Sequence, residues 1–191
     1  MIIKDKIRLK QVCDKVISIE EGEAIAVKLL EELNQSGSGV GLAANQIGIN
    51  KRVCVVNVKE PIVFINPVIT DLEGEVLYNE SCLSFPKKQA RTVRAKWVTV
   101  DSDNLGSVVF GSDDYDDSLL ESVCVQHEID HLDGITMFDR KFKLPQLKST
   151  KKFSRNEKVE ISNGTETRIL KWKKAEPMIS NDNWNLSEVS V

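Results

Sequence analysis

The chain has 191 residues, which is enough for one domain that buries its own hydrophobic core. Its formal net charge of -3 at pH 7 and its ordinary globular composition identify no class of partner. The first residues contain no long apolar run, which argues against a signal peptide or a membrane span, so we expect a cytoplasmic protein. The 4 cysteines lack Cys-x-x-Cys spacing, and disulfides are not expected in that compartment.

The first predicted element is a helix over about residues 20–34. Ser18 and Glu21 form an S-x-x-E capping box immediately before it. Its apolar residues recur at helical spacing and predict a buried stripe made of Ile25, Leu29, Leu30 and Leu33. We expect a scaffold helix without a chemical role.

A stretch rich in small residues follows, Gly39–Gln46. Its 2 glycines and 2 alanines let the backbone pass close to another element. The pattern is as compatible with a purely structural tight loop as with a functional one. Gln46 is the residue with chemistry to offer, because its side-chain amide can donate to a developing oxyanion.

From residue 52 to residue 100 the pattern is that of β-structure. Strands are predicted over 53–58, 62–69, 76–78 and 92–101, and a run over 107–110 is expected to pair with the last of these. Short strands joined by turns predict antiparallel or mixed sheets rather than β-α-β units.

The most informative stretch is 118–134, which contains His127-Glu128-x-x-His131. Ser118 and Glu121 predict a second capping box. On a helix, histidines four residues apart can bind one metal ion, and the glutamate between them can take a proton from a water that the ion activates. The apolar residues Leu120, Val123 and Cys124 lie on one face of this helix, and His127 and His131 continue the same face toward its C-terminal end. The alternative, two histidines on an ordinary amphipathic helix, is weakened because the chain has no other histidine.

A catalytic metal site uses three protein ligands and an open position, so two histidines leave it one ligand short. Cys82 lies in Asn79–Pro86, a predicted strand end that runs into a turn with free backbone N–H groups. Cys13 and Cys54 are predicted to be buried apolar side chains. On the residues alone, the choice between Cys82 and a carboxylate stays open.

The C-terminal region is lysine-rich over residues 140–174. Asn163-Gly164 lies between two apolar pairs there and predicts a β-hairpin. The last residues are polar, with Trp184 as an anchor. We therefore predict a main catalytic domain over 1–140, a basic extension with a hairpin over 141–174 in the same domain, and a tail over 175–191.

Three of these stretches together resemble the signature motifs of the peptide deformylase family. They are Gly39-Val-Gly-Leu-Ala-Ala-Asn-Gln46, Glu80-Ser-Cys-Leu-Ser84 and Gln126-His-Glu-Ile-Asp-His-Leu-Asp-Gly134, and they occur in the family's order. Phe64-Ile-Asn-Pro-Val68 is also similar, and the resemblance covers roughly residues 20–140. It implies an α+β fold in which antiparallel or mixed sheets pack around a central H-E-x-x-H helix.

The resemblance also implies an activity, the removal of the N-formyl group from the initiator methionine of new polypeptides. By position, it makes Cys82, His127 and His131 the ligands of one divalent ion. Fe²⁺ is the usual physiological ion of the family, and Zn²⁺ or Ni²⁺ can occupy the same site. Glu128 becomes the general acid/base. Gln46 and the backbone N–H of Leu83 become the oxyanion donors. The implied substrate pocket is lined by Val40, Gly41, Tyr78, Leu120, Val123 and Cys124.

The implied partners are N-formyl-methionyl nascent peptides, with the ribosome as a further partner through the basic residues 140–174. No membrane and no specific nucleic acid is expected. Two departures from the family stand out: Ser81 replaces a glycine and would cost ~1 kcal/mol if its φ had to be positive. Gln89 replaces an arginine of many bacterial members. The C-terminal region also lacks their long amphipathic helix.

Two rival functions remain at this point. An H-E-x-x-H peptidase would need a further ligand downstream, and the chain has no third histidine. A catalytically idle metal-binding module that docks on ribosomes would fit the basic extension. Formate release separates them, because the idle module releases none and the peptidase cuts internal peptide bonds instead.

Overall fold

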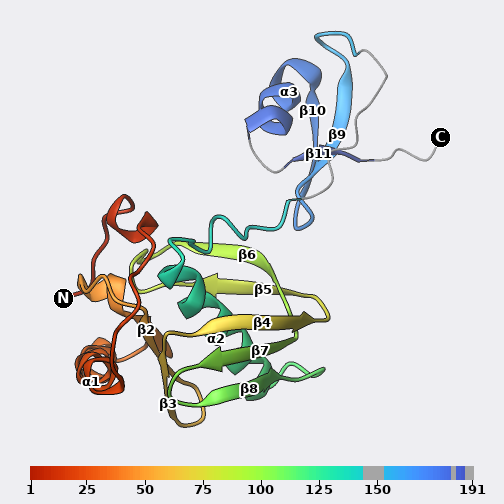
Figure 1. The fold of residues 1–191 in the computed structure, drawn as a ribbon. Coiled ribbons are helices and arrows are strands. Elements are labelled where there is room, and N and C mark those ends of the chain that lie inside the picture. The colour runs from red at the N-terminus through yellow and green to blue at the C-terminus, as the bar shows by residue number, and fades with distance from the viewer. Residues whose placement is uncertain (144–152, 182–183, 188–191) are drawn as a thin grey trace. The chain divides into compact units, whose positions relative to one another are not determined.

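The computed structural model describes residues 1–143, 153–181 and 184–187 (Figure 1). The chain divides into two compact units, Met1–Lys141 and Phe142–Val191. The expectation that 141–174 belongs to the same domain as 1–140 is therefore corrected, because the C-terminal residues form a hydrophobic core of their own.

The first unit combines two long helices with short strands and 3-10 turns (Figure 1). In chain order its elements are η1 (Arg8–Lys10), α1 (Ile19–Ser36), β1 (Gly41–Ala43), η2 (Ala44–Ile47), β2 (Val53–Asn57), β3 (Pro61–Ile65), β4 (Val68–Glu73), β5 (Val76–Ser81), β6 (Gln89–Arg94), β7 (Trp97–Ser102), β8 (Gly106–Gly111) and α2 (Asp117–Leu132).

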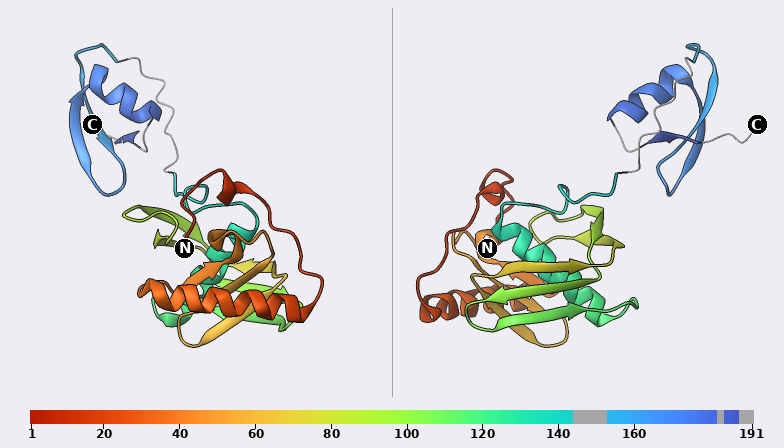
Figure 2. Two further views of the ribbon diagram at one scale, coloured as in Figure 1. Left: turned by 90° about the vertical axis from the view of Figure 1, so that its left-hand side faces the viewer. Right: turned by 45° about the vertical axis from the view of Figure 1, so that its right-hand side comes forward.

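Three antiparallel sheets surround α2, with strand orders β1-β2-β3, β4-β7-β8 and β5-β6. The helix contacts β1 and β2 as well as β4, β7 and β8. Figure 2 shows it running across one face of the β4-β7-β8 sheet. A central helix that carries H-E-x-x-H and is packed by antiparallel sheets confirms the predicted α+β fold class.

Strand β2 is buried on both faces, and alternate residues serve different cores. Val53 and Val55 pack with α1 residues such as Leu29, whereas Cys54 and Val56 pack with α2 residues that include Val125 and Ile129. Because successive side chains on a strand point to opposite faces, the continuous apolar run is explained by a sheet that is covered on both sides. This sheet therefore lies between the two helices.

Two predicted strands are each two strands in the structure. The run 62–69 divides into β3 and β4, which belong to different sheets. Asn66 between them adopts a left-handed φ of 53° and its side chain bonds the backbone N–H and carbonyl of Val16. Pro67, which follows, has no N–H to donate to a ladder. Similarly, 92–101 divides into the end of β6 and most of β7, which is Trp97–Ser102.

The N-terminal cap of α2 also differs from the prediction. Asp116, not Ser118, is the N-cap, and its carboxylate accepts from the N–H groups of Ser118 and Leu119 at 3.0 and 2.9 Å. Glu121 instead pairs with Lys59 at 2.7 Å. The first helix begins as predicted, since the Ser18 hydroxyl accepts from the Glu21 N–H. Gly134 follows α2 with a φ of 69°, as a C-terminal glycine cap requires.

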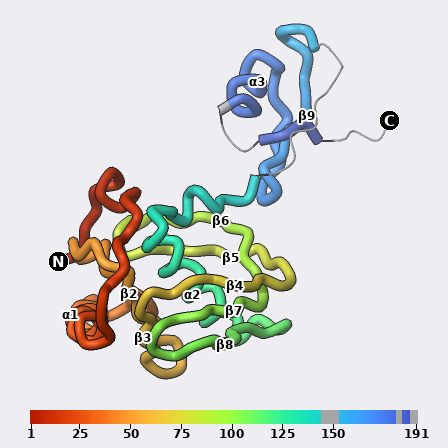
Figure 3. The backbone as a smooth tube through the Cα atoms, in the orientation of Figure 1, coloured from red at the N-terminus to blue at the C-terminus, as the bar shows by residue number. Residues whose placement is uncertain are grey.

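The second unit contains a three-stranded antiparallel sheet of order β10-β9-β11 and one helix (Figure 3). Its elements are β9 (Lys158–Ser162), β10 (Thr167–Lys171), α3 (Trp172–Asn181) and β11 (Asn185–Leu186). The β9–β10 hairpin turns at Asn163-Gly164, where the Asn163 side chain accepts from the Thr165 and Glu166 N–H groups.

The predicted tail over 175–191 is corrected by α3 and β11. Apolar side chains at helical spacing in α3 and the buried Trp184 pack on β9, which gives the described part of this range, 175–181 and 184–187, a core despite its polar composition. None of the helices in the described ranges is long and apolar enough to cross a membrane.

Candidate active site

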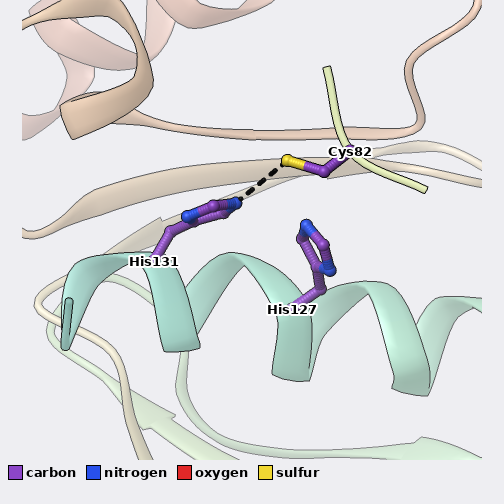
Figure 4. A group of neighbouring side chains, drawn as sticks. All are labelled: Cys82, His127 and His131. Carbon is purple, nitrogen blue, oxygen red and sulfur yellow. Dashed lines mark hydrogen bonds between the residues drawn. The ribbon is translucent and has the colours of Figure 1, made fainter. Parts of the chain in front are cut away.

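Cys82, His127 and His131 are brought together by β5 and α2. Cys82 follows the last residue of β5, and the two histidines lie one turn apart on α2. Their ligand atoms all lie within 4.8 Å of one another, with Cys82 Sγ 3.3 Å from His131 Nε2. Figure 4 shows both imidazole rings projecting from α2 toward the Cys82 sulfur.

This donor set suits a divalent transition metal ion. One thiolate and two imidazoles make three protein ligands, and such a set leaves an open position for water or substrate. The other cysteines are poor candidates, because burial raises the pKa of Cys13 to about 11 and the pKa values of Cys54 and Cys124 well above the usual range. Within the described ranges, no other group of three ligand side chains is found.

Glu80 orients one of these histidines. Its Oε2 lies 2.5 Å from His127 Nδ1, which leaves His127 Nε2 as the nitrogen directed at the metal site. Burial would raise the pKa of Glu80, but hydrogen bonds from His127 and Arg94 outweigh it and lower the pKa to about 2. The Thr92 hydroxyl also donates to Glu80. Glu80 opens the second motif, but the motif by itself predicted no role for this residue.

Arg94 and Asp130 extend this support and were missed by sequence reasoning. The Arg94 guanidinium donates to both oxygens of Glu80, at 2.6 and 3.1 Å, and to Asp130 at 2.5 Å. No local pattern identifies Arg94, since it lies on β6 and its partners lie on β5 and α2. Asp130 was visible within the third motif, but its partner was not.

Glu128 lies beside the metal-ligand group. Its side chain is buried, and among the described residues its Oε2 has no hydrogen-bond partner. Burial raises the pKa of Glu128 to about 7. A carboxyl group with a free oxygen and a pKa near neutrality can both accept and return a proton at ordinary pH.

The side-chain amide nitrogen of Gln46 points toward the metal-ligand group. The Ala43 N–H donates to Gln46 Oε1 at 2.8 Å, so the amide orientation is set by the backbone. Gln46 Nε2 then lies 3.1 Å from Ser84 Oγ and 3.5 Å from Cys82 Sγ. This places a side-chain N–H donor next to the proposed metal ligands.

A cavity of ≈ 360 Å³ opens beside these groups. Gln46, Cys82, Leu83, His127 and Glu128 all line it. So do the six predicted pocket residues, which are Val40, Gly41, Tyr78, Leu120, Val123 and Cys124. The structure thus brings together all the site residues named from the sequence. His131 is the one that does not line the cavity, because its side chain is fully buried beside Cys82 and His127.

Two small residues, Gly41 and Ser81, line the cavity. A Cβ at Gly41 would lie 2.6 Å from both Cys124 Sγ and Glu128 Oε1, so a larger residue there would displace the side chains of Cys124 and Glu128. Ser81 lines the cavity from the end of β5, where it pairs with Gln89, and it does not adopt a positive φ. The backbone cost considered for Ser81 therefore does not arise.

The first unit is similar to known proteins of one kind. The model of the family described as Polypeptide deformylase matches residues 1–149. The protein named Peptide deformylase from Neisseria gonorrhoeae is 37% identical over 158 residues, covering 81% of this chain and 93% of that protein. The one from Pseudoalteromonas translucida is 34% identical over 155 residues, covering 79% and 91%.

Solved structures give the same result. A peptide deformylase from Legionella pneumophila matches with a TM-score of 0.64 and 32% identity, covering 74% of this chain and 85% of that one. The enzyme from the Vibrio parahaemolyticus bacteriophage VP16T, solved with actinonin, matches with a TM-score of 0.60 and 31% identity, covering 71% and 98%. The family match ends at residue 149, so most of the second unit lies outside it.

Proposed function

The chain belongs to the peptide deformylase family, and from this we propose that Cys82, His127 and His131 hold its divalent metal ion while Glu128 moves the proton. Members of the family hydrolyse the N-formyl group of formyl-methionyl peptides, and this chain removes that group from newly made polypeptides and releases formate. The observation that carries the assignment of residues is the convergence of three ligand atoms within 4.8 Å beside a buried carboxyl group.

Each residue then has one task. When bound, a divalent ion supplies the Lewis acidity that polarises the formyl oxygen and lowers the pKa of the attacking water. Glu128 Oε2 takes a proton from that water as the water adds to the formyl carbon, and returns the proton to the leaving amine nitrogen. Gln46 Nε2 and the Leu83 N–H donate to the oxyanion, and each donor contributes about 3 kcal/mol.

We propose Fe²⁺ as the physiological ion, with Zn²⁺ or Ni²⁺ in the protein as isolated. One soft thiolate and two imidazoles accept all three ions. The thiolate of Cys82 also makes a ferrous site sensitive to oxidation. The methionine side chain of the substrate fits the apolar part of the cavity, where Leu120, Val123 and Cys124 line one wall.

The basic C-terminal region is proposed to bring the enzyme to the ribosome, where its substrate emerges, in the cytoplasm. Residues 140–174 contain 12 lysines and arginines but only 3 acidic residues. Such an excess favours ribosomal RNA through phosphate contacts that weaken with salt. Co-sedimentation with ribosomes at low salt that is lost at high salt supports this association, and absence of co-sedimentation at low salt rejects it.

The decisive experiment is anaerobic purification, metal analysis and a formate assay with a formyl-methionyl peptide. About one metal ion per chain and formate release are expected. Cys82→Ala should lose the ion, whereas Cys13→Ala, which changes a buried cysteine away from the site, should keep it. Full metal occupancy in Cys82→Ala would reject the ligand assignment. Cleavage of internal peptide bonds would favour the peptidase, and a metal-loaded but inactive protein would favour the idle module.

A further inference from the structure

A continuous chain of ion pairs leads from the surface of the first unit to His127. We infer that Arg140 is a positioning residue for His127, acting through Asp130, Arg94 and Glu80. The inference rests on the proposed role of His127 as a metal ligand. Arg140 lies outside the three sequence motifs and contacts neither the metal-ligand atoms nor the substrate cavity.

The outer end of the chain is a two-point contact. Arg140 Nη2 lies 2.7 Å from Asp130 Oδ1, and Arg140 Nε lies 3.0 Å from Asp130 Oδ2. The Asp130 side chain is 5% exposed and that of Arg140 is 46% exposed, so this pair joins a buried carboxylate to a partly exposed cation. A planar guanidinium on a carboxylate fixes direction as well as distance.

The inner end is a second two-point contact. Arg94, whose side chain is 3% exposed, donates to both oxygens of Glu80 and places its remaining nitrogen on Asp130. Glu80 in turn holds His127 Nδ1. Two guanidinium groups therefore face two carboxylates, and the buried chain contains no unbalanced charge between Arg140 and His127.

Arg140 is itself held by the sheet. Its carbonyl accepts from the Val93 N–H at 3.2 Å, and Lys141 forms a β-bridge with Thr92. Thr92 also donates to Glu80 through its hydroxyl group. Arg140 and Lys141, the last residues of the first unit, are thus hydrogen-bonded along β6, next to the residues that support His127. The residue that follows, Phe142, begins the second unit.

Removal of the Arg140 guanidinium has a predictable direction. Asp130 accepts three donations from arginine, two of them from Arg140, so Asp130 would be left with Arg94 alone. A buried carboxylate that loses partners attracts the remaining cation more strongly. Arg94 is then drawn toward Asp130, its hold on Glu80 loosens, and the fixed orientation of His127 is lost. Partners of this kind typically change metal affinity or activity 10- to 100-fold.

The test uses the full chain loaded with Ni²⁺. Three variants are compared with the parent: Arg140→Met, Arg140→Lys, and Lys141→Met as a control with the same charge change at the neighbouring residue, whose side chain is exposed. The measurements are the rate of Ni²⁺ release to an excess of chelator, kcat and KM for a formyl-methionyl peptide, and the melting temperature. Rates are taken well below the melting temperature of the weakest variant.

We expect Arg140→Met to release Ni²⁺ about 10-fold faster than Lys141→Met and to lower kcat with KM unchanged, since Arg140 does not touch the substrate. Arg140→Lys should release Ni²⁺ at an intermediate rate, because one ammonium group cannot make two parallel bonds. A merely structural role would lower the melting temperature but leave the release rate equal to that of the control.

Release rates of Arg140→Met and Lys141→Met within twofold of each other would overturn the inference while leaving the proposed function intact. If Arg140→Met does not fold, Arg140→Lys is compared with Lys141→Met instead. Equal Ni²⁺ release rates of these two variants would also overturn the inference. A parent protein that binds no Ni²⁺ would instead reject the proposed metal centre, and the inference with it.

Discussion

The helices α1 and α2 have similar lengths, 18 and 16 residues, but they are buried in different ways. α1 buries one apolar stripe against the β1-β2-β3 sheet and exposes the rest to solvent. α2 has 13 buried residues, and they include Gln126, His127, Glu128, Asp130 and His131. α1 is therefore held mainly by apolar burial, whereas α2 also depends on polar partners supplied by β5 and β6.

This contrast predicts that changes in α1 affect stability and changes in α2 affect chemistry. The largest expected effect is that of Glu128→Ala, which should lower kcat for formate release about 10³-fold while the metal content stays the same. The matched change in α1, Glu31→Ala, removes an exposed carboxyl group and should leave kcat unchanged. Formate release and metal content measured on both variants test this, and a Glu128→Ala enzyme with a tenth of normal activity would contradict the proton-transfer role.

The second effect concerns the buried ion pairs behind α2. Arg94→Leu leaves the buried carboxylates of Glu80 and Asp130 without their shared cation and should destabilise the first unit by about 3–5 kcal/mol. Urea unfolding, followed by hydrogen exchange in peptides from α2, measures the loss. A loss below about 1 kcal/mol would show that water replaces the guanidinium and that these carboxylates are less buried in solution.

The third expected effect is a loss of stability from a change in the apolar core beside α1. Leu29→Ala removes a fully buried side chain from the core between α1 and the β1-β2-β3 sheet and should cost about 3 kcal/mol. Metal content and KM should not change, because Leu29 is neither a metal ligand nor a lining residue of the cavity. If Leu29→Ala lowered metal content in the folded protein, the separation between the two helices drawn above would be wrong.

The smallest effects distinguish the helix caps. Asp116→Ala should cost about 1 kcal/mol, and Ser18→Ala a similar amount on α1, because each removes the acceptor for orphan N–H groups. Ser118→Ala should cost less than about 0.5 kcal/mol, since its hydroxyl does not cap α2. If thermal unfolding shows the same loss of stability for Asp116→Ala and Ser118→Ala, then Ser118 does contribute to capping α2, as the sequence pattern first predicted.

The caps also show where sequence reasoning reached its limit. Asp116 and Ser118 are both good N-cap residues and lie two positions apart, so local preference could not choose between them. Two contacts accompany the observed cap: the Ser112 hydroxyl, four residues upstream, donates to Asp116, and Lys59 from a distant part of the chain pairs with Glu121, which is then not available for a capping box. In the same way, Asn66 interrupts an apolar run because its side chain is bound by the backbone of Val16, 50 residues away in the chain.

By itself the sequence determined the H-E-x-x-H helix, the β-structure between the two long helices and, through the three motifs, the family, because these depend on the spacing of nearby residues. The tertiary structure decided which side chains support the site. Cys82 and His131 are separated by 49 positions, Glu80 and His127 by 47, and Arg94 and Asp130 by 36. Contacts of that range depend on how sheets pack around α2, and no local pattern of residues encodes them.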